Sequence, residues 1–87
     1  MGELDNEPVE RRMAPRETGP FPAVARLYSG RSVACAVLYL SEAGAKLALP
    51  KDKTLPKEFE LSIPAKNALW RVRVVWQDGK ELGVFRL

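Results

Sequence analysis

Short apolar runs separated by turn-forming residues fill the chain from Phe21 onward, and none shows a sustained helical repeat. The runs are five to nine residues long, and they either alternate apolar and polar side chains or are rich in β-branched residues, which is typical of strands. Six strands are expected, at Ala23–Tyr28, Ser32–Leu40, Ala45–Leu49, Phe59–Ile63, Leu69–Gln77 and Glu81–Leu87. Six short strands within about 65 residues predict an all-β fold, a small closed or nearly closed barrel.

The residues between the runs have turn chemistry. Ser29-Gly30 and Asp78-Gly79 are turn pairs, and Asp-Gly between two strands is a strong hairpin signal. Ser41–Gly44 and Ala65–Asn67 predict two more turns, and the polar segment 51–57, with a proline inside, predicts a loop.

The longest expected strand, Leu69–Gln77, contains both tryptophans. Alternation places Arg71 and Arg73 together on one face, most simply a solvated one, with valines on the other. A small barrel needs large apolar side chains inside, so at least one of Trp70 and Trp76 is expected in the core.

Residues 1–20 have a different composition, with few apolar side chains, no periodicity and three prolines. Such a segment predicts a flexible N-terminal arm. The expected organisation is therefore an arm over 1–20 and a barrel over 21–87.

Charge is distributed unevenly along the chain. The first ten residues carry four carboxylates and no base, so the other 77 residues hold all 14 bases and seven acids, a net charge of +7. The acidic head is expected to be a solvated tail, or alternatively a shield for the basic segment after it. A body this basic attracts nucleic acid, phosphorylated metabolites or an acidic protein face.

Several function classes lack the residues they need. The chain has no histidine and a single cysteine, Cys35, which rules out an intramolecular disulfide and a thiolate metal cage. No catalytic residues, metal or cofactor are therefore expected, and Cys35 is expected to pack as a small hydrophobe. Since no apolar stretch is long enough for a membrane span or a secretory signal, the expected location is the cytoplasm.

Two short elements do suggest a ligand. Arg11, Arg12 and Arg16 place three guanidiniums within six residues, and a guanidinium fork suits phosphate oxygens and the O6/N7 edge of guanine. Downstream, the turn at Ser41–Gly44 offers a hydroxyl, backbone donors and a glycine able to take a positive φ. Each element alone is also compatible with a solvated charge run or an ordinary turn.

Together the two elements resemble the PilZ domain, a bacterial receptor module for cyclic dimeric GMP (c-di-GMP). Arg12–Arg16 matches the R-x-x-x-R motif of that family, after the frequent E-R-R opening. Ser41 and Gly44 match the serine and glycine of its [D/N]-x-S-x-x-G motif, and Leu40–Leu47 is similar to L-S-x-x-G-A-x-L. The ending, with Val72–Trp76 and Leu82–Phe85, resembles the closing hairpin of the family, so the resemblance covers residues 10–87.

The resemblance implies a six-stranded antiparallel Greek-key barrel and c-di-GMP as the ligand, bound without a metal. It implies that Arg12 and Arg16 clamp the phosphates, that Arg11 assists, and that Ser41 and Gly44 hold the purine at the barrel rim. The arm is expected to fold over the ligand, and the signal to pass to a downstream protein partner.

Tyr39 occupies the position where the family has Asp or Asn. The resemblance implies that this position contacts the guanine edge, which a tyrosine cannot do as a short acceptor does. If the ring stacks on a guanine, it adds about 1 to 3 kcal/mol of binding free energy. If it fills the base pocket, the lost base contact weakens binding by about 1 to 3 kcal/mol.

Two other functions remain open. A PilZ-type domain that has lost its ligand would act as a protein-protein interaction module, which Tyr39 favours. A small basic barrel can instead bind single-stranded nucleic acid. Such barrels usually display several aromatic side chains on a concave strand face, whereas of the seven aromatic residues here only the two tryptophans and Tyr28 or Tyr39 could serve that role.

Overall fold

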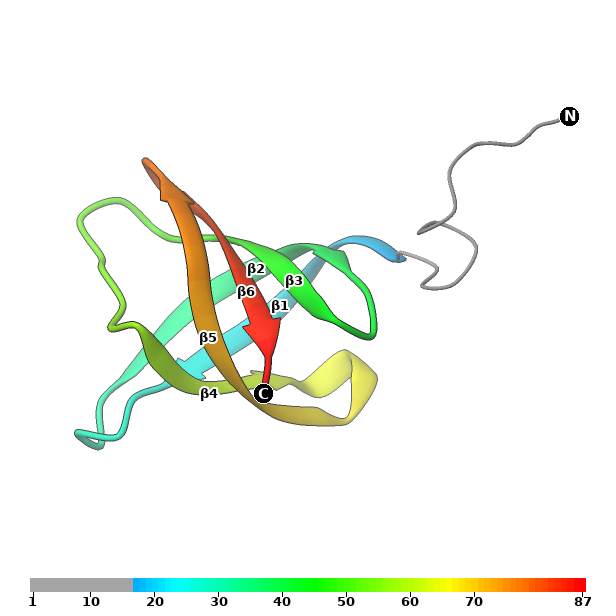
Figure 1. Cartoon of the computed structure of the whole chain (residues 1–87), viewed down its shortest axis with the longest axis horizontal. Helices are drawn as coiled ribbons and strands as arrows, with labels where there is room; N and C mark the ends of the chain where they lie inside the picture. Colours follow the sequence, from blue (N-terminus) through cyan, green and yellow to red (C-terminus); the bar gives the residue numbers. More distant parts are fainter. Residues whose placement is uncertain (1–16) are drawn as a thin grey trace, which may run out of the picture.

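Six antiparallel strands form a closed barrel in the computed structural model, which describes residues 17–87 (Figure 1). The strands are β1 (Glu17–Arg26), β2 (Ser32–Leu40), β3 (Gly44–Ala48), β4 (Glu58–Ile63), β5 (Ala68–Asp78) and β6 (Glu81–Arg86). A 3-10 helix, η1 (Pro64–Lys66), joins β4 to β5. Within this part of the chain, no helix is long and apolar enough to cross a membrane.

The strand order around the barrel is β1-β2-β3-β6-β5-β4, and β4 closes the barrel by pairing with β1. The arrangement β4-β1-β2-β3 is a Greek key, because three sequential strands are followed by a fourth that returns beside the first. The loop between β3 and β4 makes this crossing (Figure 1). The predicted six-stranded antiparallel Greek-key barrel is therefore confirmed.

The prediction for the first strand was wrong. β1 begins at Glu17, six residues before the predicted start, so the expected arm boundary at residue 20 falls inside this strand. Gly19 and Pro20, which fall in the predicted arm, lie in an irregularity of the β1-β2 ladder between Thr18 and Phe21. A proline is tolerated there because a bulge position needs no ladder N–H. The other five strands begin and end within one residue of the prediction.

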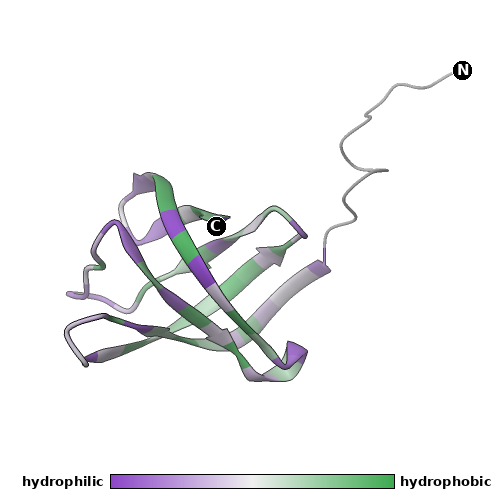
Figure 2. Cartoon of the chain, turned by 60° about the horizontal axis from the view of Figure 1, so that its bottom comes forward, coloured by the Kyte–Doolittle hydropathy of each residue, from purple (hydrophilic) through white to green (hydrophobic). Residues whose placement is uncertain are grey.

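Alternate residues of the strands form one apolar core. β4 illustrates the pattern, since Phe59, Leu61 and Ile63 are fully buried and the residues between them are half-buried. Hydrophobic and hydrophilic bands alternate along the strands in Figure 2. No polar or charged side chain of residues 17–87 is buried.

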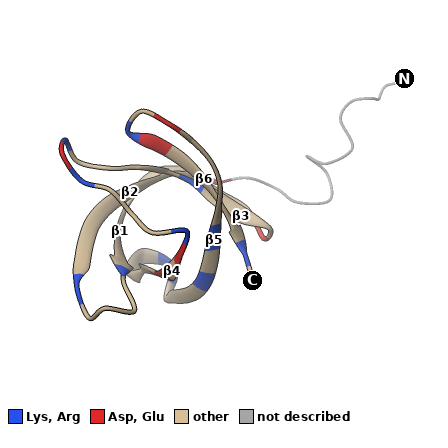
Figure 3. Ribbon diagram, turned by 60° about the vertical axis from the view of Figure 1, so that its left-hand side comes forward, with Lys and Arg blue, Asp and Glu red and all other residues tan. Residues whose placement is uncertain are grey.

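The outer face carries the charged residues, which lie along the strands and in the turns (Figure 3). Arg71 and Arg73 are exposed as predicted, and the guanidinium of Arg73 donates to the Glu58 carboxylate at 2.6 Å. Trp70 packs against the core, whereas Trp76 follows an irregularity in the β5-β6 ladder and is 44 % exposed. One tryptophan therefore supports the core, as expected, and the other lies on the surface.

Cys35 packs partly buried against the core, as expected for a small hydrophobe. Burial raises the pKa of its thiol to about 11. At pH 9 an ordinary thiol is more than half ionised, whereas Cys35 is expected to be about 1 % thiolate and correspondingly unreactive.

The rate of Cys35 alkylation by iodoacetamide, measured from pH 7 to 11.5, is expected to rise with a midpoint near pH 11. Because the unfolded thiol ionises first, its contribution to stability is complete below about pH 8.5 and is lost as pH rises toward 11. A midpoint below pH 9 in the folded protein would contradict this assignment.

Candidate ligand-binding site

The turn between β2 and β3 is held by three hydrogen bonds. The backbone N–H of Ser41 donates to the carbonyl of Gly44 at 2.9 Å, and the Ser41 hydroxyl donates to the same carbonyl at 3.4 Å. The backbone N–H of Arg86 donates to the carbonyl of Ala43 at 2.7 Å. These bonds tie the turn to itself and to the end of β6, so its position relative to the barrel is well defined.

Gly44 is required here for a different reason from the one predicted. A positive φ was expected, but the positive-φ glycines of residues 17–87 are Gly30 and Gly79. Instead, β3 and β6 come so close at Gly44 that a Cβ atom would lie 2.0 Å from the carbonyl oxygen of Val84. The backbone of the neighbouring strand therefore leaves no room for a side chain.

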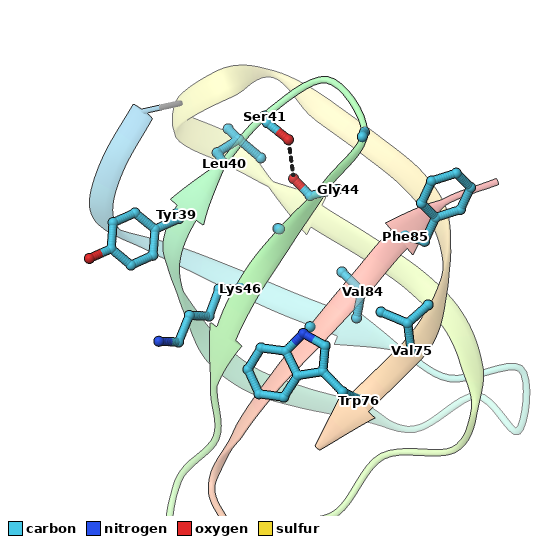
Figure 4. A pocket seen from close by; sticks show the side chains of 12 residues that line it. Tyr39, Leu40, Ser41, Gly44, Lys46, Val75, Trp76, Val84 and Phe85 are labelled. Carbon is cyan, nitrogen blue, oxygen red and sulfur yellow. Dashed lines mark hydrogen bonds between the residues drawn. The ribbon is translucent and has the colours of Figure 1, made fainter. Parts of the chain in front are cut away.

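A groove of about 440 Å³ runs over the outer surface beside this turn. Its volume falls within the range of small-molecule sites. Strands β2, β3, β5 and β6 and the β2-β3 turn contribute its lining, which is Tyr39, Leu40, Ser41, Ala43, Gly44, Ala45, Lys46, Val75, Trp76, Gly83, Val84 and Phe85 (Figure 4). The three predicted site residues of the described chain, Tyr39, Ser41 and Gly44, thus lie in one groove.

Exposed apolar side chains form the far wall of the groove. Val75, Trp76 and Phe85 are 60 %, 44 % and 53 % exposed. The indole of Trp76 lies against Gly83, where a Cβ atom would fall 2.0 Å from Nε1. The glycine therefore lets the indole lie close to β6, which creates an aromatic surface at the level of Lys46, the register partner of Gly83.

Lys46 supplies the positive charge of the groove. Its Nζ lies 5.6 Å from the centre of the Tyr39 ring, a cation–π contact between register partners on β3 and β2. The same Nζ is 3.2 Å from Oε1 of Glu81, which does not line the groove. Figure 4 shows the Tyr39 hydroxyl pointing away from Ser41 and the turn.

The family model of the PilZ domain matches residues 10–86, nearly the whole chain. The chain belongs to the PilZ domain family. A search of curated proteins found no match. The matched range includes both motifs identified in the sequence, so the predicted family is confirmed.

The arginine motif of this PilZ domain cannot be placed in the same way. Arg11, Arg12 and Arg16 lie outside the described residues. Their point of attachment is defined, however, because Glu17 pairs with Leu40, the residue before Ser41. The N-terminal segment therefore joins the barrel beside the turn.

A second groove, of about 540 Å³, lies on the other side of the turn and shares Leu40 and Ser41 with the first. Here the guanidinium of Arg86 stacks over the Trp70 ring, with Cζ 4.6 Å from the centre of the ring. Lys66 forms an ion pair with Glu17. The turn of the PilZ motif is thus flanked by cations on both sides.

Sequence reasoning missed three residues of the first groove, Lys46, Trp76 and Phe85. All three belong to stretches that resemble the family, but those patterns do not show that the side chains share a groove with Tyr39. Within residues 17–87, no group of three or more His, Cys, Asp or Glu side chains is arranged to hold a metal ion.

Proposed function

We propose that this PilZ domain binds c-di-GMP in the groove beside the Ser41–Gly44 turn and acts as a small second-messenger receptor. The observation that carries the proposal is that Tyr39, Ser41 and Gly44 line one groove, next to the point where the arginine-bearing segment joins the barrel. PilZ domains are generally c-di-GMP-binding modules.

The arginines are the phosphate ligands in this proposal. Arg16 directly precedes Glu17, and Arg12 precedes it by five residues, an extended length of at most about 18 Å. The groove is therefore within reach of both guanidiniums. Arg12 and Arg16 clamp the two phosphates of the ligand through charge-assisted hydrogen bonds, and Arg11 assists them.

The groove walls provide the base contacts. A purine placed between the turn and β5 meets the exposed indole of Trp76, and base–aromatic stacking contributes about 1 to 3 kcal/mol. The outward position of the Tyr39 hydroxyl keeps the space beside Ser41 open (Figure 4). The groove therefore favours retained binding over a base pocket filled by the Tyr39 ring.

Calorimetric titration with c-di-GMP tests the proposal. We expect saturable binding with a Kd on the order of micromolar, or about 8 kcal/mol of binding free energy. A generic single-stranded oligonucleotide serves as the control for non-specific attraction to a basic protein. Absence of heat with tens of micromolar protein would exclude a c-di-GMP receptor.

In that event a protein-interaction module is the second candidate. The exposed apolar side chains of Val75, Trp76 and Phe85, together on one face, favour it. In both cases we propose that the output passes through a downstream protein partner.

Gly83→Ala is expected to weaken c-di-GMP binding about tenfold with little loss of stability. The new Cβ displaces the Trp76 indole, whose exposed side chain can move into solvent, and so removes one stacking surface. Trp76→Ala is expected to cause the same loss, and combining both substitutions to cause no further loss. Additive losses in this double-mutant cycle would show that Gly83 does not act through Trp76.

A further inference from the structure

The second groove contains a planar cation fixed on an aromatic ring. The guanidinium of Arg86 lies over the Trp70 ring, with Cζ 4.6 Å from the ring centre, and both residues line the groove. Trp70 packs against the core, so its ring is held in place, whereas Arg86 is exposed. Since one face of the guanidinium covers the ring, the other face is directed outward.

The backbone of Arg86 is tied to the motif turn. Its N–H donates to the carbonyl of Ala43 at 2.7 Å, and on β5 its register partner is the buried Val72. The guanidinium therefore starts from a fixed point beside the turn. Nucleobases stack on guanidinium planes as they do on aromatic rings, and a guanidinium already held on an indole loses little freedom when a base covers it.

Polar side chains of the second groove suit the edge of a guanine. Glu42 and Asn67 belong to its lining. Guanine carries donors at N1 and at the 2-amino group and an acceptor at O6, which match a carboxylate and an amide. Glu42 directly follows Ser41, so the motif turn contributes to both grooves.

The two grooves meet at Leu40 and Ser41, which line both. A c-di-GMP molecule has two guanines, attached on opposite sides of a ring of two sugars and two phosphates. Glu17 lines the second groove and pairs with Leu40, and Arg16 directly precedes it in the sequence. A ligand ring placed over Ser41 thus lies where the arginine-bearing segment joins the barrel, with one groove on each side.

We propose that the two guanines of one c-di-GMP molecule bind in different grooves, the first on Trp76 and the second on the outer face of the Arg86 guanidinium. The inference rests on the proposed function and adds a second base subsite to it. Trp70 and Arg86 lie outside the stretches that carry the family resemblance, so this subsite follows from the structure alone.

The fluorescence of Trp70 tests the inference in the Trp76→Phe variant. The chain has two tryptophans, so this variant leaves Trp70 as the only one and keeps an aromatic ring in the first groove. We expect c-di-GMP to change the Trp70 emission saturably, with a Kd within about twofold of the calorimetric value for the same variant. Calorimetric binding without a change in Trp70 emission overturns the inference and leaves the proposed function intact. Absence of binding by the unmodified chain overturns both.

Arg86→Lys assigns the second subsite to its residue. The variant keeps the positive charge and the backbone N–H that Ala43 accepts, but it loses the planar group, so c-di-GMP is expected to bind about tenfold more weakly. Arg71→Lys is the matched control, because Arg71 is exposed on β5 and outside both linings. We expect it to change the Kd by less than about twofold. Thermal melting verifies that each variant is folded, and equal Kd values for the two variants would overturn the role of Arg86.

Combining Arg86→Lys with Trp76→Ala tests whether the two residues contact different bases. If each base loses its own stacking surface, the two losses multiply to about a hundredfold. NMR titration with c-di-GMP measures the weakened Kd. A combined loss no larger than that of either single variant would place both residues on one base and overturn the inference.

Discussion

The double variant Arg12→Ala/Arg16→Ala is expected to lower c-di-GMP affinity by at least about a hundredfold, to where micromolar titration detects no binding. Hydrogen bonds to charged groups contribute about 1.5 to 3 kcal/mol each, and the two arginines are the proposed clamps of two phosphates. Their loss therefore removes about 3 to 6 kcal/mol of a total near 8 kcal/mol. Calorimetry at fixed ionic strength measures the effect.

Arg26→Ala/Arg31→Ala provides a control with the same change in net charge. Both residues are exposed, and they flank the β1-β2 turn, at the opposite end of β1 from Glu17. Because screened long-range attraction alone is weak, this control is expected to change the Kd by less than about threefold. Equal losses in the two double variants would mean that general charge, and not the motif, drives binding.

Gly44→Ala is expected to destabilise the barrel by about 3 kcal/mol, which lowers the Tm of a domain this small by more than about 10 °C. The added Cβ would meet the Val84 carbonyl oxygen at 2.0 Å, and that oxygen belongs to the neighbouring strand. Rotating a side chain cannot relieve such a contact. Strands β3 and β6 must separate, which weakens their ladder and the closure of the barrel.

Gly79→Ala isolates the effect of backbone conformation. Gly79 has a φ of 63°, and a Cβ there meets nothing within 4 Å, so the substitution introduces strain without a clash. We expect a cost of about 1 kcal/mol. Thermal denaturation of both variants compares the two effects. If Gly44→Ala melts no lower than Gly79→Ala, close backbone approach is not the reason for a glycine at position 44.

Most of the fold could be predicted because strands and turns leave local signals. Ser32–Leu40 was predicted with its observed bounds, and Phe59–Ile63 alternates as its buried residues do. The exception is β1, whose first residues, with Gly19 and Pro20 among them, have the composition of a flexible arm. They are accommodated because β2 lies alongside and an irregularity absorbs them. Whether Gly19 and Pro20 can lie in a strand therefore depends on a partner strand about twenty residues away in the sequence.

The candidate site was only partly predictable. Ser41, Gly44 and Tyr39 stand at the positions of a short motif, so the sequence alone could select them as candidate site residues. Trp76 could not be assigned, because the irregularity between Val74 and Trp76 changes which face of β5 its side chain occupies. A shift of one residue in register reverses the inward and outward faces of a strand, and sequence alone does not reveal the shift.

By itself, the sequence determined five of the six strands, the turns and the PilZ family, since alternation, turn residues and motifs are properties of neighbouring positions. Only the tertiary structure decided what surrounds the motif. It brought Lys46 beside Tyr39, and Trp76 and Phe85 into the same groove, because the strand order places β6 between β3 and β5. It also showed that position 44 requires a glycine because β3 and β6 approach closely there, and not because the backbone has a positive φ. The sequence could not show this, because the atom that excludes a side chain, the Val84 carbonyl oxygen, is forty residues away in the chain.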